Sequence, residues 1–189
     1  MRIAISGKMK SGKTTLAWHL ERAFAREGNY SSKTCSFADP IRQALRELGI
    51  EKAAHPELYR KGAQYIGTEL CRAYDPDWWV KRMAVRTYRM PLAEPVIIDD
   101  MRFQNEYDWC RENGFILVRL DISPEMVYNR GGEEGTFDHP SETGLDHIER
   151  EEWHLWCSED TSVDQRVQAV LQCVQRETSS QSGPSSPRS

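Results

Sequence analysis

G-K-M-K-S-G-K-T-T, residues Gly7–Thr15, is the most informative stretch of this sequence. It fits the phosphate-binding pattern G-x-x-x-x-G-K-[ST], whose backbone N–H groups and following helix N-terminus surround an anion. The apolar run Arg2–Ser6 before it predicts a buried strand, and from Thr14 onward the apolar residues recur at helical spacing. A strand, a glycine-rich loop and a helix in this order favour a phosphate-binding loop over an ordinary glycine-rich turn.

The residue types within this loop each suit one part of a bound nucleoside triphosphate. Gly7 and Gly12 permit unusual backbone angles and the close approach of a phosphate. Lys13 is expected to reach the β- and γ-phosphates, and the Thr14 hydroxyl is expected to ligate Mg²⁺. The candidate phosphate-binding residues are Gly7, Lys10, Ser11, Gly12, Lys13, Thr14 and Thr15.

Composition limits the class of protein. The net charge of -4 argues against a protein that coats nucleic acid. No apolar run approaches the ~20 residues that span a membrane, and we recognise no signal peptide before the first strand. The five cysteines are scattered without a C-x-x-C pair, which indicates a reducing compartment and small buried side chains instead of zinc ligands. We expect a cytoplasmic protein whose partners are small molecules, with no stable nucleic-acid or membrane partner.

Strand and helix patterns alternate along the chain. This order predicts an α/β fold with a mostly parallel five-stranded sheet and helices on both faces. From Glu177 onward the sequence lacks apolar residues, so we expect a domain over residues 1–176 and a disordered tail over 177–189. The predicted strands are Arg2–Ser6, Lys33–Phe37, Pro95–Ile98, Phe115–Ile122 and Trp153–Cys157.

Helical patterns dominate the segment between the second and third strands. Asp39 precedes Pro40 and is predicted to cap a short helix. A longer helix is predicted over Pro56–Tyr74, where two adjacent cations either face solvent or hold an acceptor phosphate. Two adjacent tryptophans follow and cannot share one helical face, so we expect one in the core and one beside a pocket. The side chains concerned are the apolar stripe of Leu58, Tyr65, Ile66 and Leu70, the cations Arg60 and Lys61, and Trp78 and Trp79.

Two carboxylates follow the apolar strand Pro95–Ile98, and an arginine comes soon after. Ligands of open α/β sheets lie at the carboxyl ends of the strands, so Asp99 or Asp100 is placed to bind Mg²⁺ directly or through water. Asp100 could instead cap a helix. Arg102 suits a clamp on the transferring phosphate.

A glycine-rich segment follows the helix that Ser123, Pro124 and Glu125 are predicted to begin. Arg130 precedes Gly131 and Gly132, and such a segment is typical either of a mobile lid or of a surface loop.

Taken together with the loop, several further segments resemble the bacteriophage deoxynucleoside monophosphate kinases. The animal-type phosphomevalonate kinases are similar in the same places, with an S-G-K-x-K-S-G-K loop, an Asp-x-Arg after the third strand and a Ser-Glu-x-Gly-Leu-Asp segment. The matching segments are S-F-A-D-P-I-R (Ser36–Arg42), Y-R-K-G-A-Q-Y-I-G-T-E (Tyr59–Glu69), D-P-D-W-W (Asp75–Trp79), I-I-D-D-M-R-F-Q-N-E (Ile97–Glu106) and H-P-S-E-T-G-L-D (His139–Asp146).

The resemblance implies a fold and a reaction. It implies a P-loop NTPase with strand order 2-3-1-4-5, an acceptor-binding helical region at about residues 40–90 and a lid at about 125–140. It also implies transfer of the γ-phosphoryl group of ATP, with Mg²⁺, to the phosphate of a small acceptor. Aromatic residues in the acceptor region favour a deoxynucleotide over phosphomevalonate. A homodimer is compatible with this reading, as is a location in the host cytoplasm if the gene is viral.

Site residues follow from the loop, from the charges near the strand ends and from the resemblance. Asp100 is preferred over Asp99 as the metal ligand because it matches the family's Asp-x-Arg. The expected catalytic residues are Lys13, Arg102 and Arg130; the metal ligands are Thr14 and Asp100; and the acceptor-binding residues are Asp39, Arg42, Arg60, Lys61, Tyr65, Trp79, Arg102 and Glu142.

Three rival functions stand beside the nucleotide kinase. One is a phosphomevalonate kinase. Another is a P-loop switch protein, which binds nucleotide without an acceptor and signals by loop ordering. The third, a kinase of nucleic-acid 5′ ends, is disfavoured by the acidic net charge.

Overall fold

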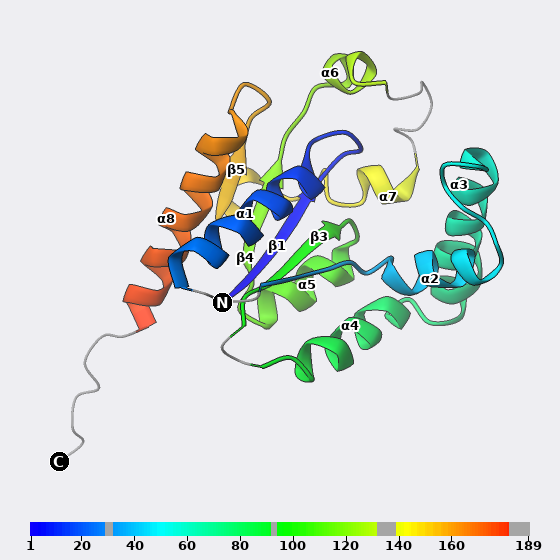
Figure 1. Cartoon of the computed structure of the whole chain (residues 1–189), viewed down its shortest axis with the longest axis horizontal. Helices are drawn as coiled ribbons and strands as arrows, with labels where there is room; N and C mark the ends of the chain where they lie inside the picture. The colour runs from blue at the N-terminus through cyan, green and yellow to red at the C-terminus, as the bar shows by residue number, and fades with distance from the viewer. Residues whose placement is uncertain (29–31, 92–93, 132–138, 182–189) are drawn as a thin grey trace.

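The computed structural model describes residues 1–28, 32–91, 94–131 and 139–181 (Figure 1). Its five strands form one parallel sheet in the order β2-β3-β1-β4-β5. The predicted fold class and the strand order 2-3-1-4-5 are therefore confirmed. The strands are β1 Arg2–Gly7, β2 Lys33–Cys35, β3 Val96–Met101, β4 Ile116–Leu120 and β5 Leu155–Cys157.

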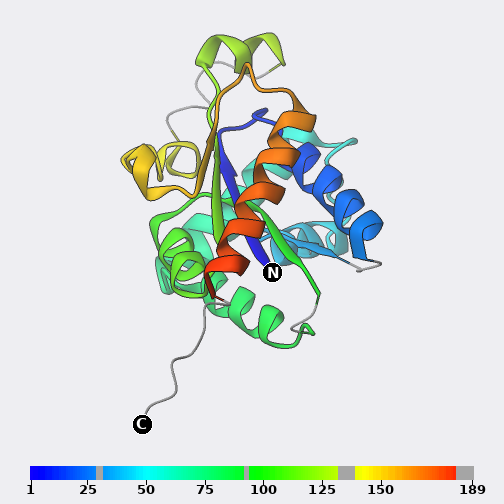
Figure 2. The same cartoon turned by 90° about the vertical axis from the view of Figure 1, so that its left-hand side faces the viewer.

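Helices connect the strands and cover both faces of the sheet. Figure 2 shows α8 lying beside α1 on one face. The helices are α1 Lys13–Gly28, α2 Asp39–Glu47, α3 Pro56–Gln64, the π-helix η1 Tyr65–Arg72, α4 Trp78–Tyr88, α5 Gln104–Glu112, α6 Pro124–Asn129, α7 Pro140–Thr143, the 3₁₀ turn η3 Arg150–Glu152 and α8 Val163–Gln181.

The core has two halves because successive side chains of a strand point to opposite faces of the sheet. In β1, Ile3 and Ile5 face α1 and α8, while Ala4 between them faces the half that contains α2, α4 and α5. The fully buried strands explain why their sequences are almost continuously apolar.

The predicted helix Pro56–Tyr74 is divided into α3 and η1, and its predicted apolar stripe is wrong. Leu58, Tyr65 and Leu70 are exposed, and only Ile66 packs against the core. The i→i+5 bonds of a π-helix rotate the side chains away from a 3.6-residue stripe. Glycine provides the contact with α2 instead, since a Cβ at Gly62 would lie 2.8 Å from Leu45.

Two predicted boundaries also change, at the start of α2 and in the C-terminal tail. The N-cap of α2 is Ala38, and Asp39 is the first helical residue. Helix α4 begins at Trp78, after an Asp77 N-cap. Helix α8 continues to Gln181, so the predicted disorder is wrong for 177–181; the rest of that tail lies outside the described residues. None of the helices in the described ranges has the length and apolar character needed to cross a membrane.

Candidate active site

The loop between β1 and α1 has the geometry that its glycines predict. Gly7 has φ +153°, and a Cβ there would lie 2.6 Å from both the Leu120 carbonyl oxygen and Ser11 Oγ. Gly12 has φ +95°, in the region that favours glycine. Close contacts at Gly7 and the positive φ of Gly12 therefore favour glycine at both ends of the loop.

Lys13 lies over this loop and is 8% exposed. Its Nζ donates to the carbonyl oxygens of Gly7 at 2.7 Å and Lys8 at 2.8 Å. Burial, and next the positive charge of Arg102, lower the pKa of Lys13 from 10.5 to about 7. The amine is thus held where a phosphate could replace the two carbonyls as its partner.

Asp99, and not the predicted metal ligand Asp100, is the carboxylate beside Thr14. Thr14 Oγ1 donates to Asp99 Oδ2 at 3.3 Å, and Ser36 Oγ donates to Asp99 Oδ1. Asp100 instead accepts the N–H groups of Phe37 at 2.7 Å and Ala38 at 3.0 Å. Adjacent side chains of a strand face opposite sides, so only one of the pair can meet Thr14.

The pair of Thr14 and Asp99 suits Mg²⁺, which prefers oxygen ligands. Within the described ranges, no group of three or more His, Cys, Asp or Glu side chains could hold a metal ion. A Mg²⁺ ion held here would complete its coordination with water and substrate phosphates, as is usual for this ion. Burial, and next the nearby Glu106, raise the pKa of Asp100 to about 7.

Arg102 and Glu142 lie together against the phosphate-binding loop. Arg102 Nη1 donates to the Ser141 carbonyl at 3.0 Å and to the Glu142 carboxylate, whose other oxygen accepts the Met9 N–H at 2.6 Å. The backbone N–H of Arg102 donates to the buried Glu106 at 2.7 Å. Glu142 therefore joins Arg102 to the loop.

A second group of charges surrounds the carboxyl end of β2. Arg42 Nη1 donates to Ser36 Oγ at 2.8 Å and to Asp39 Oδ1 at 3.0 Å. Arg86 of α4 pairs with the other oxygen of Asp39. Sequence analysis missed Arg86, because it is one of several arginines on a solvated helix and nothing in its spacing points to Asp39.

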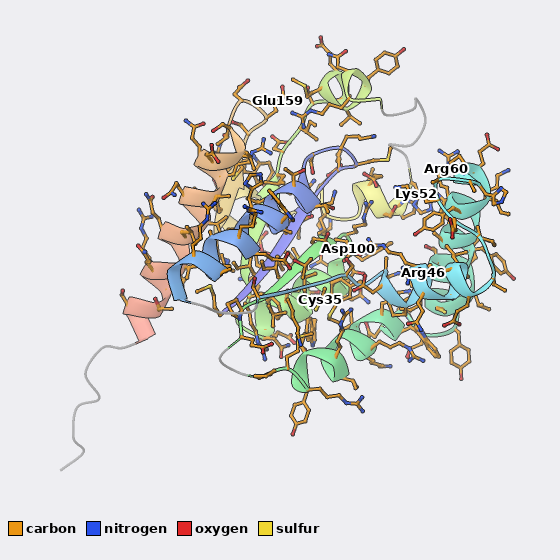
Figure 3. The ribbon with its side chains drawn as sticks, in the orientation of Figure 1. Cys35, Arg46, Lys52, Arg60, Asp100 and Glu159 are labelled. Atoms are coloured by element: carbon orange, nitrogen blue, oxygen red, sulfur yellow. The ribbon has the colours of Figure 1, made fainter. Side chains whose placement is uncertain are left out.

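The other predicted acceptor residues are divided between the core and the exposed side of the helices that connect β2 and β3. Trp79 is 4% exposed in the core, where its Nε1 donates to the Gly67 carbonyl at 2.9 Å, so its predicted contact with the acceptor is wrong. Arg60 and Lys61 lie on the exposed side of α3, and Figure 3 shows Arg60 well apart from Asp100. Tyr65 is 56% exposed on η1.

Two arginines approach the loop from different helices. Arg130, which follows α6, donates from Nη1 to the Lys10 carbonyl at 3.0 Å. Arg166 of α8, which sequence analysis missed because it sits in an ordinary amphipathic pattern, donates from Nη1 to the Ser11 carbonyl at 3.2 Å. Between them lies a pocket of about 340 Å³, lined by both arginines, Ser11, Thr15, Asp160 and Ser162 among others. Of the predicted lid, residues 132–138 lie outside the described residues.

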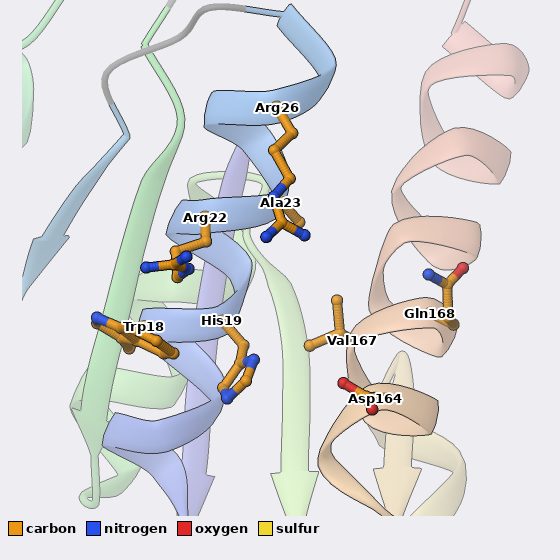
Figure 4. A pocket seen from close by; sticks show the side chains of 8 residues that line it. All are labelled: Trp18, His19, Arg22, Ala23, Arg26, Asp164, Val167 and Gln168. Carbon is orange, nitrogen blue, oxygen red and sulfur yellow. The ribbon is translucent and has the colours of Figure 1, made fainter.

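A larger groove of about 430 Å³ lies further along α1 and α8 (Figure 4). Trp18 is half exposed there, and the Arg22 guanidinium lies 4.6 Å from the centre of its ring. None of the residues predicted to contact phosphate line this groove. The candidate active site is therefore the loop and the carboxyl edge of the sheet, not this groove.

A phosphate-binding loop between β1 and α1 of a parallel sheet in this strand order is the defining feature of the P-loop NTPase fold, so the protein has that fold. A family model described as an AAA domain matches residues 3–154, so the chain belongs to that family. A putative deoxynucleotide monophosphate kinase of Acanthamoeba polyphaga mimivirus is 28% identical over 199 residues, covering 91% of this chain and 95% of the relative.

Solved structures share the fold at low sequence identity. The shikimate kinase of Aquifex aeolicus superposes with a TM-score of 0.57 at 14% identity, covering 97% of this chain and 100% of that one. The APS kinase CysC of Mycobacterium tuberculosis, in complex with AMPPNP and APS, gives 0.57 at 17% identity, covering 92% and 98%. These similarities confirm the P-loop kinase fold and leave the substrate to be argued from the site.

Proposed function

We propose that this protein transfers the γ-phosphoryl group of ATP to a deoxynucleoside monophosphate, producing a diphosphate for nucleotide supply. The observation that carries the proposal is the arrangement of cations around Asp99 and Thr14. Lys13 donates to loop carbonyls, and Arg42 donates to Ser36, which itself donates to Asp99. Arg102 donates to Glu142, which accepts the N–H of Met9 in the loop. The name of the mimivirus relative supports the choice of acceptor.

The reaction needs positioning and charge neutralisation more than covalent chemistry. Lys13 and the loop N–H groups hold the donor, while Arg42 and Arg102 hold the acceptor phosphate. An oxygen of that phosphate attacks the γ-phosphorus, the bond to the β–γ bridging oxygen breaks, and ADP leaves. The acceptor phosphate is already ionised, so no general base is required. When bound, Mg²⁺ would neutralise charge on the donor phosphates.

The pocket between Arg130 and Arg166 suits the donor base, because it opens directly from the phosphate loop. On the acceptor side, Tyr65 has the exposure that stacking on a base requires, whereas Trp79 does not. Stacking of a base on an aromatic ring contributes ~1–3 kcal/mol.

The decisive experiment measures ADP release from ATP with a panel of acceptors. Deoxynucleoside monophosphates, ribonucleoside monophosphates and phosphomevalonate are supplied singly, with water alone as the control. We expect strong stimulation by at least one deoxynucleotide. Stimulation by phosphomevalonate alone would show that the protein is a phosphomevalonate kinase. Tight nucleotide binding without stimulation by any acceptor would favour a P-loop switch protein.

A pH prediction follows from Lys13. A bound polyphosphate favours the charged amine, so the pKa of Lys13 should rise on binding from its value of about 7. Above pH 7.5, binding must then take up a proton, and ATP affinity should weaken by up to about tenfold per pH unit. Calorimetry in buffers of different ionisation enthalpy between pH 7.5 and 9 measures this uptake. In Lys13→Arg, which stays charged, the proton uptake should disappear; its persistence would assign it to another group.

A further inference from the structure

Arg166 is a buried cation without a carboxylate partner in the part of the chain that the structure describes. It is 7% exposed, and its Nε is buried with no hydrogen-bond partner. The nearby Glu159 carboxylate accepts from Ser123 N and Ser123 Oγ instead. Burying an unpaired charge is costly, so this arrangement calls for an explanation beyond stability.

The hydrogen bonds of Arg166 join two segments that are far apart in sequence. Nη1 donates to the Ser11 carbonyl at 3.2 Å, and Nη2 donates to the Ser158 carbonyl at 2.8 Å and the Glu159 carbonyl at 3.5 Å. One guanidinium therefore bridges the phosphate loop and the turn after β5. A planar group with several donors in fixed directions suits this task, whereas a lysine amine does not.

The two bridged segments are two walls of the 340 Å³ pocket. Their separation sets the width of that pocket, so Arg166 sets the width as well. The guanidinium is also close to the loop backbone, since a Cβ at Gly12 would lie 3.6 Å from Nη1. Its positive charge faces Arg130 across the pocket, and an anionic donor would relieve the repulsion between them.

We propose that Arg166 is a positioning residue for the donor nucleotide, which holds the Ser158–Glu159 turn at the distance from Ser11 that admits the donor base. The inference rests on the donor half of the proposed function, the binding of ATP by the loop, and requires no acceptor. A nucleotide should therefore depend on Arg166 more strongly than an inorganic polyphosphate, which lacks the base.

The test compares the binding of ATP and of inorganic tripolyphosphate to the full chain by calorimetry, without acceptor. Arg166→Lys keeps the charge but replaces the two guanidinium nitrogens, each of which donates to one wall, with a single amine nitrogen. We expect it to weaken ATP binding about tenfold, the value of one lost base contact, and to change tripolyphosphate binding less than about twofold. Arg166→Gln should show the same selectivity if the lysine variant does not fold. The control is Arg26→Lys, an exposed arginine that should change neither affinity.

The relative loss of ATP and tripolyphosphate affinity in the Arg166 variants distinguishes a positioning role from a purely electrostatic one. Equal losses for both ligands would show that Arg166 supplies only charge, and unchanged ATP affinity would show that it does not position the turn. Either result overturns the inference while leaving the kinase proposal intact. A wild-type protein that binds neither ligand would instead overturn the donor site itself, and both proposals with it.

Discussion

Lys13→Ala is expected to lower kcat by about 10³-fold while the protein stays folded. Removing one preorganised donor from a developing anion typically costs on the order of 10²–10³ in rate, and Lys13 is both a donor and a full charge beside the transferring phosphate. The variant should fold, because the hydrogen bonds of Lys13 within the described residues go to the Gly7 and Lys8 carbonyls of the same loop. Alanine at this position also removes the free-energy cost of burying the charged amine, the same cost that lowers the pKa of Lys13.

Steady-state turnover with the best acceptor measures this effect, with the melting temperature as a check on folding. The matched control is Lys33→Ala, since Lys33 starts β2 at the amino-terminal end of that strand and pairs with Glu94 there. Turnover near the wild-type rate in a folded Lys13→Ala protein would contradict the donor site.

The phosphate loop could be predicted because its determinants are local. Gly7, Gly12 and Lys13 act within a single strand–loop–helix unit, so spacing alone identifies them. The same holds for Ser123, whose hydroxyl accepts the Met126 N–H at 3.2 Å as the helix-start pattern predicts. The strand order came from the resemblance, since the pattern of strands and helices does not determine it.

What could not be predicted depends on contacts between distant segments. The sequence shows that Trp79 is an aromatic residue in the predicted acceptor region, but it does not show that the Trp79 side chain is buried in the core. The predicted stripe is wrong at Tyr65 and Leu70 because a π-helix cannot be distinguished from an α-helix by composition. Arg166 carries no local signal, and it becomes visible only when α8 folds against Ser11.

Glu106 shows a further limit of local patterns. The resembling segment contains it, but its role depends on a buried ion pair with Arg72 at the end of η1. Its second oxygen accepts the N–H groups of Arg102 and Phe103 at 2.7 and 3.1 Å. One carboxylate therefore links the acceptor-side helix to the backbone of the proposed clamp on phosphate.

Replacement of each of the two adjacent aspartates should give opposite results. Asp99 faces the Thr14 hydroxyl at 3.3 Å and is positioned for the metal or a metal-bound water. Asp99→Asn removes a charge that Mg²⁺ prefers, so we expect kcat to fall about 10²-fold and the Mg²⁺ concentration for half-maximal rate to rise. Asp100 accepts two backbone N–H groups and carries a pKa of about 7. Asp100→Asn should leave that Mg²⁺ concentration within about twofold of wild type.

Mg²⁺ titration of turnover in wild type and both variants distinguishes the two carboxylates, with excess EDTA as the metal-free control. Full activity in EDTA would remove the metal from the mechanism altogether. A raised Mg²⁺ requirement in Asp100→Asn, with Asp99→Asn unaffected, would restore the choice that the Asp-x-Arg resemblance favoured. The two results are separable because the carboxylates point to different neighbours: Asp99 to the first turn of α1, and Asp100 to the backbone that leads into α2.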